Sequence, residues 1–78
     1  MPVTRSFQVI LEWDPRDRVW VTHVPALGDI STFGESREEA LDQTREAILG
    51  YLEAAAKGGI DVPATAAEVE LVQLDVAV

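Results

Sequence analysis

The chain has 78 residues, of which 6 are basic and 14 acidic, so its formal net charge at pH 7 is −8. This length suits one small domain, and we treat residues 1–78 as a single unit. The scattered basic residues disfavour direct nucleic-acid binding, which needs a concentrated cationic surface. The lack of cysteine excludes disulfides and thiolate chemistry. No apolar run approaches the roughly 20 residues that span a bilayer, so we expect a cytoplasmic protein without membrane contact.

Two segments near the N-terminus predict an antiparallel hairpin. Residues 6–13 (SFQVILEW) alternate apolar and polar side chains, except at Ile10, as a half-buried strand does. A turn follows at 14–18 (DPRDR), where the proline presets φ and Asp14 can accept hydrogen bonds from nearby amides. Residues 19–25 (VWVTHVP) are rich in β-branched and aromatic side chains and predict the second strand.

The next stretch leads from a third strand into one long helix. Residues 30–33 (ISTF) predict the strand, and we expect Gly34 to permit a backbone bend that a Cβ would resist. Ser36 and Glu39 have the spacing of a capping box at a helix start. Apolar residues at helical spacing then predict an amphipathic helix over 37–57, about 30 Å long, which two glycines end. Its stripe is better explained as a core face than as a coiled-coil surface.

The C-terminal residues predict a fourth strand. Residues 68–78 (EVELVQLDVAV) alternate with one change of phase, which indicates a β-bulge near Leu71 and Val72. The expected fold is α+β with the order β-β-β-α-β, in which one helix covers one sheet face and the last strand pairs parallel to the first. A hinge at 60–66 (IDVPATA) could instead send that strand to a neighbouring subunit, which would bury the second apolar face around Ile10.

The apolar fraction of 47% is high for so short a chain, and self-association would bury the surplus. We therefore expect a homo-oligomer, a dimer or a tetramer. The acidic charge is compatible with a basic protein partner, although acidity also keeps a protein soluble.

The sequence contains no recognisable catalytic motif. His23 lies within a predicted strand, without a cysteine or a second histidine, so a structural role is expected. The serines lack a nucleophile elbow, and the glycine spacing forms no phosphate-binding loop. We predict no enzyme activity, no metal and no cofactor. A metal-dependent nuclease would need two or three converging carboxylates, and the first strand offers only Glu12.

Three short phrases occur in a recognisable order. They are Val24, Pro25 and Leu27; then Gly34, Ser36, Glu39 and Ala40; then Tyr51 and Leu52. Their order and spacing resemble the HicB-like antitoxin family over about residues 7–56. The resemblance implies a fold like a reduced ribonuclease H domain, usually without its catalytic acids. It also implies binding to a small basic toxin, the endoribonuclease HicA, whose active site the antitoxin covers.

The chain departs from the family pattern at two places. The family's frequent P-G-C phrase is replaced by residues 28–30 (GDI), and the chain ends at Val78 without the DNA-binding segment of many members, so we expect no operator binding. Partner contacts are predicted in the turns and at the helix start, and the candidates are Asp14, Asp17, Trp20, Asp29, Glu35 and Glu38. For each, a solvated turn or a packed aromatic is the alternative. The alternative function is a stand-alone oligomeric module that binds a ligand or regulates another protein without a toxin.

Overall fold

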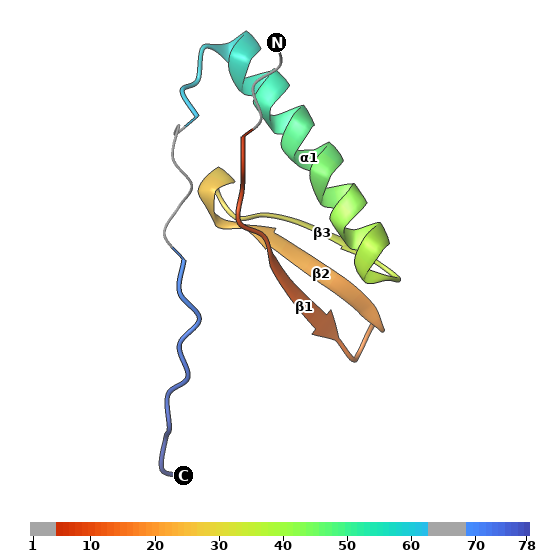
Figure 1. The fold of residues 1–78 in the computed structure, drawn as a ribbon, viewed down its shortest axis with the longest axis vertical. Helices are drawn as coiled ribbons and strands as arrows, with labels where there is room; N and C mark the ends of the chain where they lie inside the picture. The colour runs from red at the N-terminus through yellow and green to blue at the C-terminus, as the bar shows by residue number, and fades with distance from the viewer. Residues whose placement is uncertain (1–4, 63–68) are drawn as a thin grey trace.

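The computed structural model describes residues 5–62 and 69–78, which contain a three-stranded sheet and one helix (Figure 1). The strands are β1 (Ile10–Asp14), β2 (Val19–Val24) and β3 (Ile30–Gly34). A short 3-10 helix, η1 (Pro25–Leu27), joins β2 to β3, and the long helix is α1 (Arg37–Gly58). The predicted α+β class, the hairpin, the third strand and the helix are confirmed.

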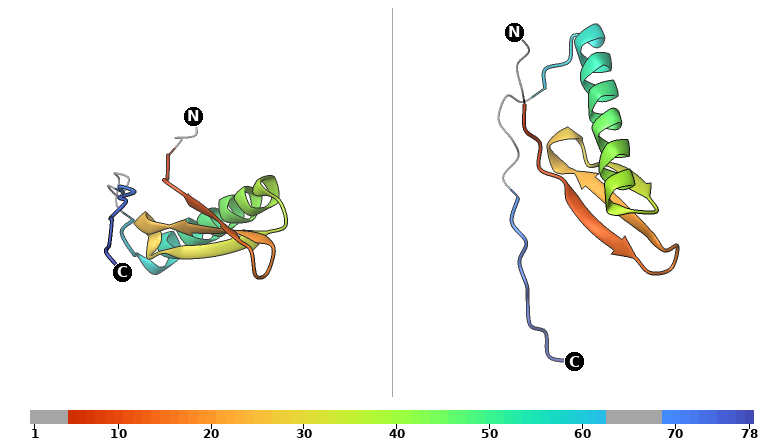
Figure 2. Two further views of the ribbon diagram at one scale, coloured as in Figure 1. Left: turned by 90° about the horizontal axis from the view of Figure 1, so that it is seen from below. Right: turned by 45° about the vertical axis from the view of Figure 1, so that its right-hand side comes forward.

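The sheet is antiparallel with the order β1-β2-β3, so β1 and β3 are its edges. Leu11 lies opposite Thr22, and Thr22 lies opposite Thr32, so these three side chains share one face. Helix α1 packs on this face, over β3 and β2 (Figure 2). No helix or strand of the described residues packs on the opposite face, which we call the open sheet face. Its residues are Ile10, Glu12, Asp14, Val19, Val21, His23, Ser31 and Phe33.

Both ends of α1 have the caps that the sequence predicts. The Glu39 amide donates to the Ser36 hydroxyl at 3.0 Å, which satisfies one of the free N–H groups of the first turn. At the other end Gly59 adopts the left-handed conformation, with φ +69°, and its amide bonds back to the last turn. The 22 residues of α1 extend about 33 Å, whereas the strands span only about 20 Å. The helix therefore projects beyond the sheet at its C-terminal end (Figure 1).

The core between α1 and the sheet is small and contains a cluster of threonine hydroxyls. Thr22 and Thr44 are fully buried, and their Oγ1 atoms lie 2.6 Å apart. The Thr32 hydroxyl is 2.8 Å from both, and the Thr44 hydroxyl donates to the Ala40 carbonyl at 2.7 Å. The cluster therefore joins β2, β3 and α1 through polar groups, in a core whose buried apolar residues are Val24, Leu27, Ala40 and Ala55.

Gly34 has a different role from the predicted one. It is the last residue of β3 and its φ is not positive, so no special backbone conformation requires glycine there. A Cβ on Gly34 would instead lie 2.5 Å from the Ala40 nitrogen and 2.9 Å from the Ala40 Cα. The glycine is required because β3 and the start of α1 approach too closely for any side chain.

The predicted fourth strand does not form within the chain. Residues 69–78, which we call the C-terminal segment, have no regular secondary structure and extend along one side of the molecule past the sheet (Figures 1 and 2). The predicted pairing beside the first strand is wrong, and the predicted bulge has no ladder to interrupt. Most of the linker predicted at 60–66 lies outside the described residues.

Strand β1 is also shorter than predicted, because residues 6–9 precede it without regular structure. After Val24, the chain turns from β2 into η1, so no strand is available there to pair with residues 6–9. On the side away from β2, residues 6–9 face the position that a fourth strand beside β1 would occupy.

Candidate functional site

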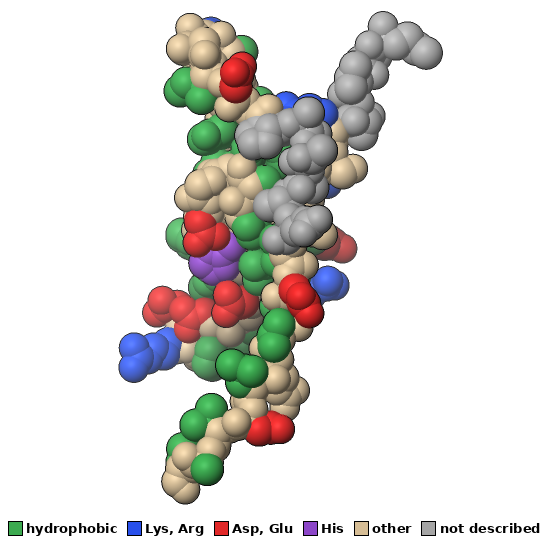
Figure 3. All heavy atoms as spheres, turned by 90° about the vertical axis from the view of Figure 1, so that its left-hand side faces the viewer, with side chains coloured by type: hydrophobic (Ala, Val, Ile, Leu, Met, Phe, Trp, Pro, Cys, Tyr) green, Lys and Arg blue, Asp and Glu red, His purple; other side chains and the backbone are tan. Residues whose placement is uncertain are grey.

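The open sheet face combines an apolar centre with acidic side chains. The register of the three strands aligns the residues of this face in two rows. One row contains Ile10, His23 and Ser31, and the other contains Glu12, Val21 and Phe33. Phe33 is 67% exposed, although it is one of the largest side chains of the sheet. Figure 3 views the molecule from the side of the C-terminal segment and shows the histidine with acidic and apolar side chains around it. An exposed aromatic bordered by charge is typical of a protein-binding surface.

Asp14 and Asp17 lie at one end of this face, in the turn between β1 and β2. Together with Val19, Val21 and Phe33 they border a shallow hollow of about 300 Å³. Asp14 Oδ1 accepts the amides of Arg16 and Asp17, at 2.9 and 3.3 Å, so this carboxylate stabilises the turn as predicted. Asp17 is exposed, and its side chain makes no such turn contact. Asp17 is therefore the better placed of the two for an external contact.

His23 makes a cross-strand contact on the same face. Its Nε2 atom lies 3.3 Å from Glu12 Oε1, a diagonal pair across β1 and β2. Among the residues that the structure describes, no three histidine or carboxylate groups are arranged to hold a metal ion. His23 therefore contacts Glu12 on the open sheet face, at the β1 edge of the sheet.

Trp20 faces away from the two turn aspartates. It lies in β2 on the side of α1, where its ring centroid is 5.4 Å from that of Trp13 and the rings are tilted by 59°. The Arg37 guanidinium lies 5.9 Å from the centre of the Trp20 ring, within the range of a cation–π contact. Trp20 thus packs at the sheet end near the helix start and does not belong to the open sheet face.

The other three predicted contact residues lie in two further places. Glu35 lies between β3 and α1, and Glu38 lies in the first turn of α1, where the helix dipole favours a carboxylate. Asp29 has a φ of +65° and follows η1, at the opposite end of the strands from Asp14. A strand length of about 20 Å separates these ends. The six predicted residues therefore do not form one continuous surface.

Sequence reasoning missed two residues of this face, Phe33 and Glu12, as contact candidates. In β3, Ile30 and Thr32 alternate with Ser31 and Phe33, so Phe33 points away from the helix if Thr32 points toward it. The alternation is visible in the sequence. What the sequence lacks is the register that aligns Glu12, Val21 and Phe33 in one row.

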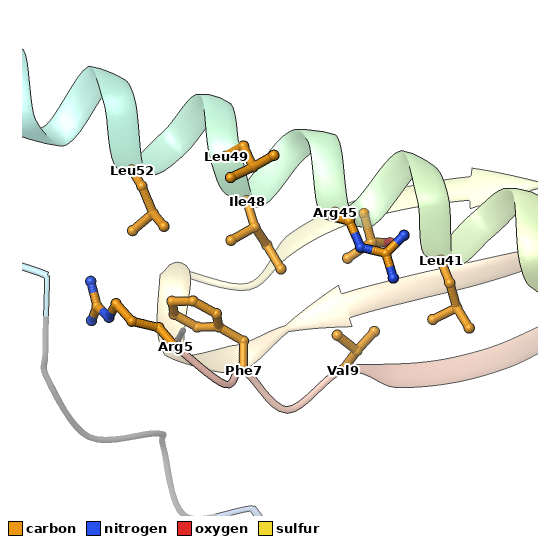
Figure 4. Close-up of a pocket in the computed structure, with 9 residues that line it drawn as sticks. Arg5, Phe7, Val9, Leu41, Arg45, Ile48, Leu49 and Leu52 are labelled. Atoms are coloured by element: carbon orange, nitrogen blue, oxygen red, sulfur yellow. The ribbon is translucent and has the colours of Figure 1, made fainter. Parts of the chain in front are cut away.

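A second hollow lies on the other face, between α1 and the residues that precede β1. We call it the edge groove; its volume is about 420 Å³ and its lining residues are Arg5, Phe7, Val9, Leu41, Thr44, Arg45, Ile48, Leu49 and Leu52. Figure 4 shows Phe7 and Val9 pointing toward the helix residues above them. The groove is mainly apolar and lies on the β1 side of the sheet.

No family model, curated protein or solved structure matches this chain. Within the described ranges, no helix combines the length and the apolar character that a membrane crossing requires. The functional argument below therefore starts from the geometry of the two surfaces and from the resemblance in sequence.

Proposed function

We propose that this chain is a protein-binding domain of the antitoxin type, and that its open sheet face contacts a small basic protein. The observation that carries the proposal is the exposed Phe33 in a row with Val21 and Glu12, next to the hollow bordered by Asp14 and Asp17. A buried apolar centre with a polar rim is the usual anatomy of a protein interface, and aromatic anchors supply much of its affinity.

The charge of the chain supports a basic partner. A net charge of −8 on 78 residues attracts cationic proteins at long range, and the carboxylates at the edge of the face would orient them. Glu12 and Asp17 are the exposed acids next to the apolar centre. Electrostatic steering would therefore speed association, and Phe33 would hold the complex.

The resemblance to HicB-like antitoxins supplies the proposed identity of the partner. By analogy, it is a HicA-like ribonuclease, and the chain would neutralise it by covering its active site. The ribonuclease H-like character of the fold rests on the same analogy and is proposed with it. The chain itself is proposed to catalyse no reaction.

The test compares tagged full-length variants in a pull-down from the native host at low salt. Asp17→Lys raises the net charge by two beside the apolar centre. Glu46→Lys makes the same change in charge on the exposed surface of α1. We expect the unmodified chain and the Glu46→Lys control to recover a small basic protein in fixed stoichiometry. Asp17→Lys should bind it at least about tenfold more weakly at low salt.

A second assay distinguishes neutralisation from mere binding. The recovered basic protein, freed from the complex, should cleave messenger RNA, and the added chain should stop the cleavage. Asp17→Lys should stop it only at higher concentration. Equal recovery by all three chains, or cleavage that the added chain does not reduce, would contradict the proposal.

A stand-alone oligomeric module without a toxin is the second candidate. The apolar edge groove and the exposed C-terminal segment favour it, because both are surfaces for self-association or for an apolar ligand. In that case the pull-down would return only the chain itself, as a defined oligomer, and screening for ligands would follow.

A further inference from the structure

The C-terminal segment exposes a series of apolar side chains. Leu71, Leu74 and Val76 are 86%, 79% and 74% exposed, and Val72 and Val78 are exposed as well. From residue 72 to 78 the large aliphatic side chains alternate with two polar residues and one small one, Gln73, Asp75 and Ala77, which is the period of a half-buried strand. Such a segment is suited to cover an apolar surface, yet in the single chain residues 70–78 are all exposed.

The free edge of β1 offers a matching place. Among the described residues, β1 pairs only with β2, so its outer N–H and C=O groups have no ladder partner. Val69 and Leu71 approach residues 8–11 at this edge, but a gap of about 320 Å³ lies between the two parts of the chain. The segment thus reaches the edge at its start and then extends away without pairing (Figure 1).

A strand at this position would contact the edge groove. A strand added outside β1 would place alternate side chains on the helix side of the sheet, beside Phe7 and Val9 and below the flank of α1. The groove there is lined by Ile48, Leu49 and Leu52, and its volume of about 420 Å³ accommodates several aliphatic side chains. The series of Val72, Leu74 and Val76 supplies such side chains at the spacing of a strand.

We propose that the C-terminal segment of one copy adds as a fourth strand to the free β1 edge of a second copy, and that the second copy returns the same contact. Within one copy, Val69 and Leu71 approach the β1 edge of the same chain, yet no strand pairing forms there. Reciprocal exchange pairs both edges and fills both grooves in one closed dimer. The proposal goes beyond toxin binding and is independent of it, because the added strand lies at the sheet edge and fills the groove on the helix side. The open sheet face, which includes Ile10, stays accessible, so the expectation that strand exchange buries this face is not part of the proposal.

Two variants with lysine at neighbouring positions of the segment test the proposal. Leu74→Lys places a charge on the apolar side of the segment, and Gln73→Lys adds the same side chain on the polar side. Leu74 is 79% exposed in the single chain, so neither variant is expected to disturb the folding of one copy, and circular dichroism checks this. Light scattering after size exclusion then measures the mass of each full-length chain over a range of concentrations.

The unmodified chain should have twice the 8.5 kDa mass of one copy. Leu74→Lys should weaken the dimer at least about tenfold, because it removes one buried leucine from each of two equivalent contacts. Gln73→Lys should stay within about threefold of the unmodified chain. A monomer at every concentration, or equal weakening by both variants, would overturn the proposal.

Amide hydrogen exchange locates the contact. In the dimer, residues 8–14 and 69–78 should both exchange more slowly than in the Leu74→Lys monomer, because both gain ladder hydrogen bonds. Protection of 69–78 alone would mean that two C-terminal segments pair with each other, which would overturn the assignment of the β1 edge. Loss of toxin binding would leave every one of these results unchanged, so the two proposals fail separately.

Discussion

Gly34→Ala tests the close approach of β3 to the start of α1. The added Cβ would lie 2.5 Å from the Ala40 nitrogen, whereas non-bonded heavy atoms prefer about 3.5–4.0 Å. The atoms that it meets belong to the backbone of Glu39 and Ala40, so no side chain can rotate away. The helix start must therefore move by about 1 Å relative to β3.

The expected loss of stability follows from this displacement. Overpacking of a well-packed contact costs about 1–3 kcal/mol, and Ala40, whose carbonyl accepts the Thr44 hydroxyl, must move with the helix. The alanine also reduces the entropy of the unfolded chain, which offsets about 0.4–1 kcal/mol. At the middle of these ranges the steric cost is larger, so we expect net destabilisation of about 1 kcal/mol and a melting temperature lower by about 4–8 °C.

Gly50→Ala is the matched control with the opposite sign. Gly50 lies on the exposed side of α1, and a Cβ there would meet no atom within 4 Å. Alanine should stabilise the helix by about 0.5–1 kcal/mol. Urea denaturation followed by circular dichroism, at one protein concentration, measures both variants. A Gly34→Ala chain as stable as the unmodified one would refute the reasoning.

Two further substitutions test the polar contacts of the fold. Ser36→Ala removes the acceptor of the Glu39 amide and should lower the free energy of unfolding by about 1 kcal/mol, measured by urea denaturation, whereas Ser36→Asp should retain most of it. Thr22→Val keeps the shape of the side chain but leaves the hydroxyls of Thr32 and Thr44 with one partner fewer, and should cost about 1–3 kcal/mol. Unchanged thermal stability of Thr22→Val would show that the hydroxyl cluster contributes nothing beyond its methyl groups.

The elements with local signals could be predicted from the sequence. The cap at Ser36, the left-handed Gly59 and the turn at Asp14 depend on residues two to four positions away, and all three form as expected. These contacts are encoded within a few residues, so they mark the turn of the hairpin and the two ends of the helix.

The features that depend on distant partners could not be predicted in the same way. The sequence pattern shows that residues 72–78 can form a strand, but it does not show whether an edge is available to them within the chain. The local sequence suggests backbone freedom as the role of Gly34, whereas the structural reason for the glycine is the short distance to Ala40 across the β3–α1 junction. The six candidate contact residues lie at both ends and on both faces of the sheet, because register and strand direction, which no local pattern gives, decide where each one points.

The order in which the elements pack has a kinetic consequence. Strand β1 pairs with β2, and β2 pairs with β3. Strand β3 in turn packs against α1, so each of these elements contacts the next one along the chain. Mixed domains of this kind fold faster than all-β domains, whose contacts are mostly between distant parts of the chain. Residues 10–58 should therefore reach their structure at a rate that does not depend on concentration. Addition of a strand from a second copy follows a different rate law, because it requires two chains to meet and its rate rises with concentration. Dilution would therefore slow the addition of the strand without slowing the folding of residues 10–58.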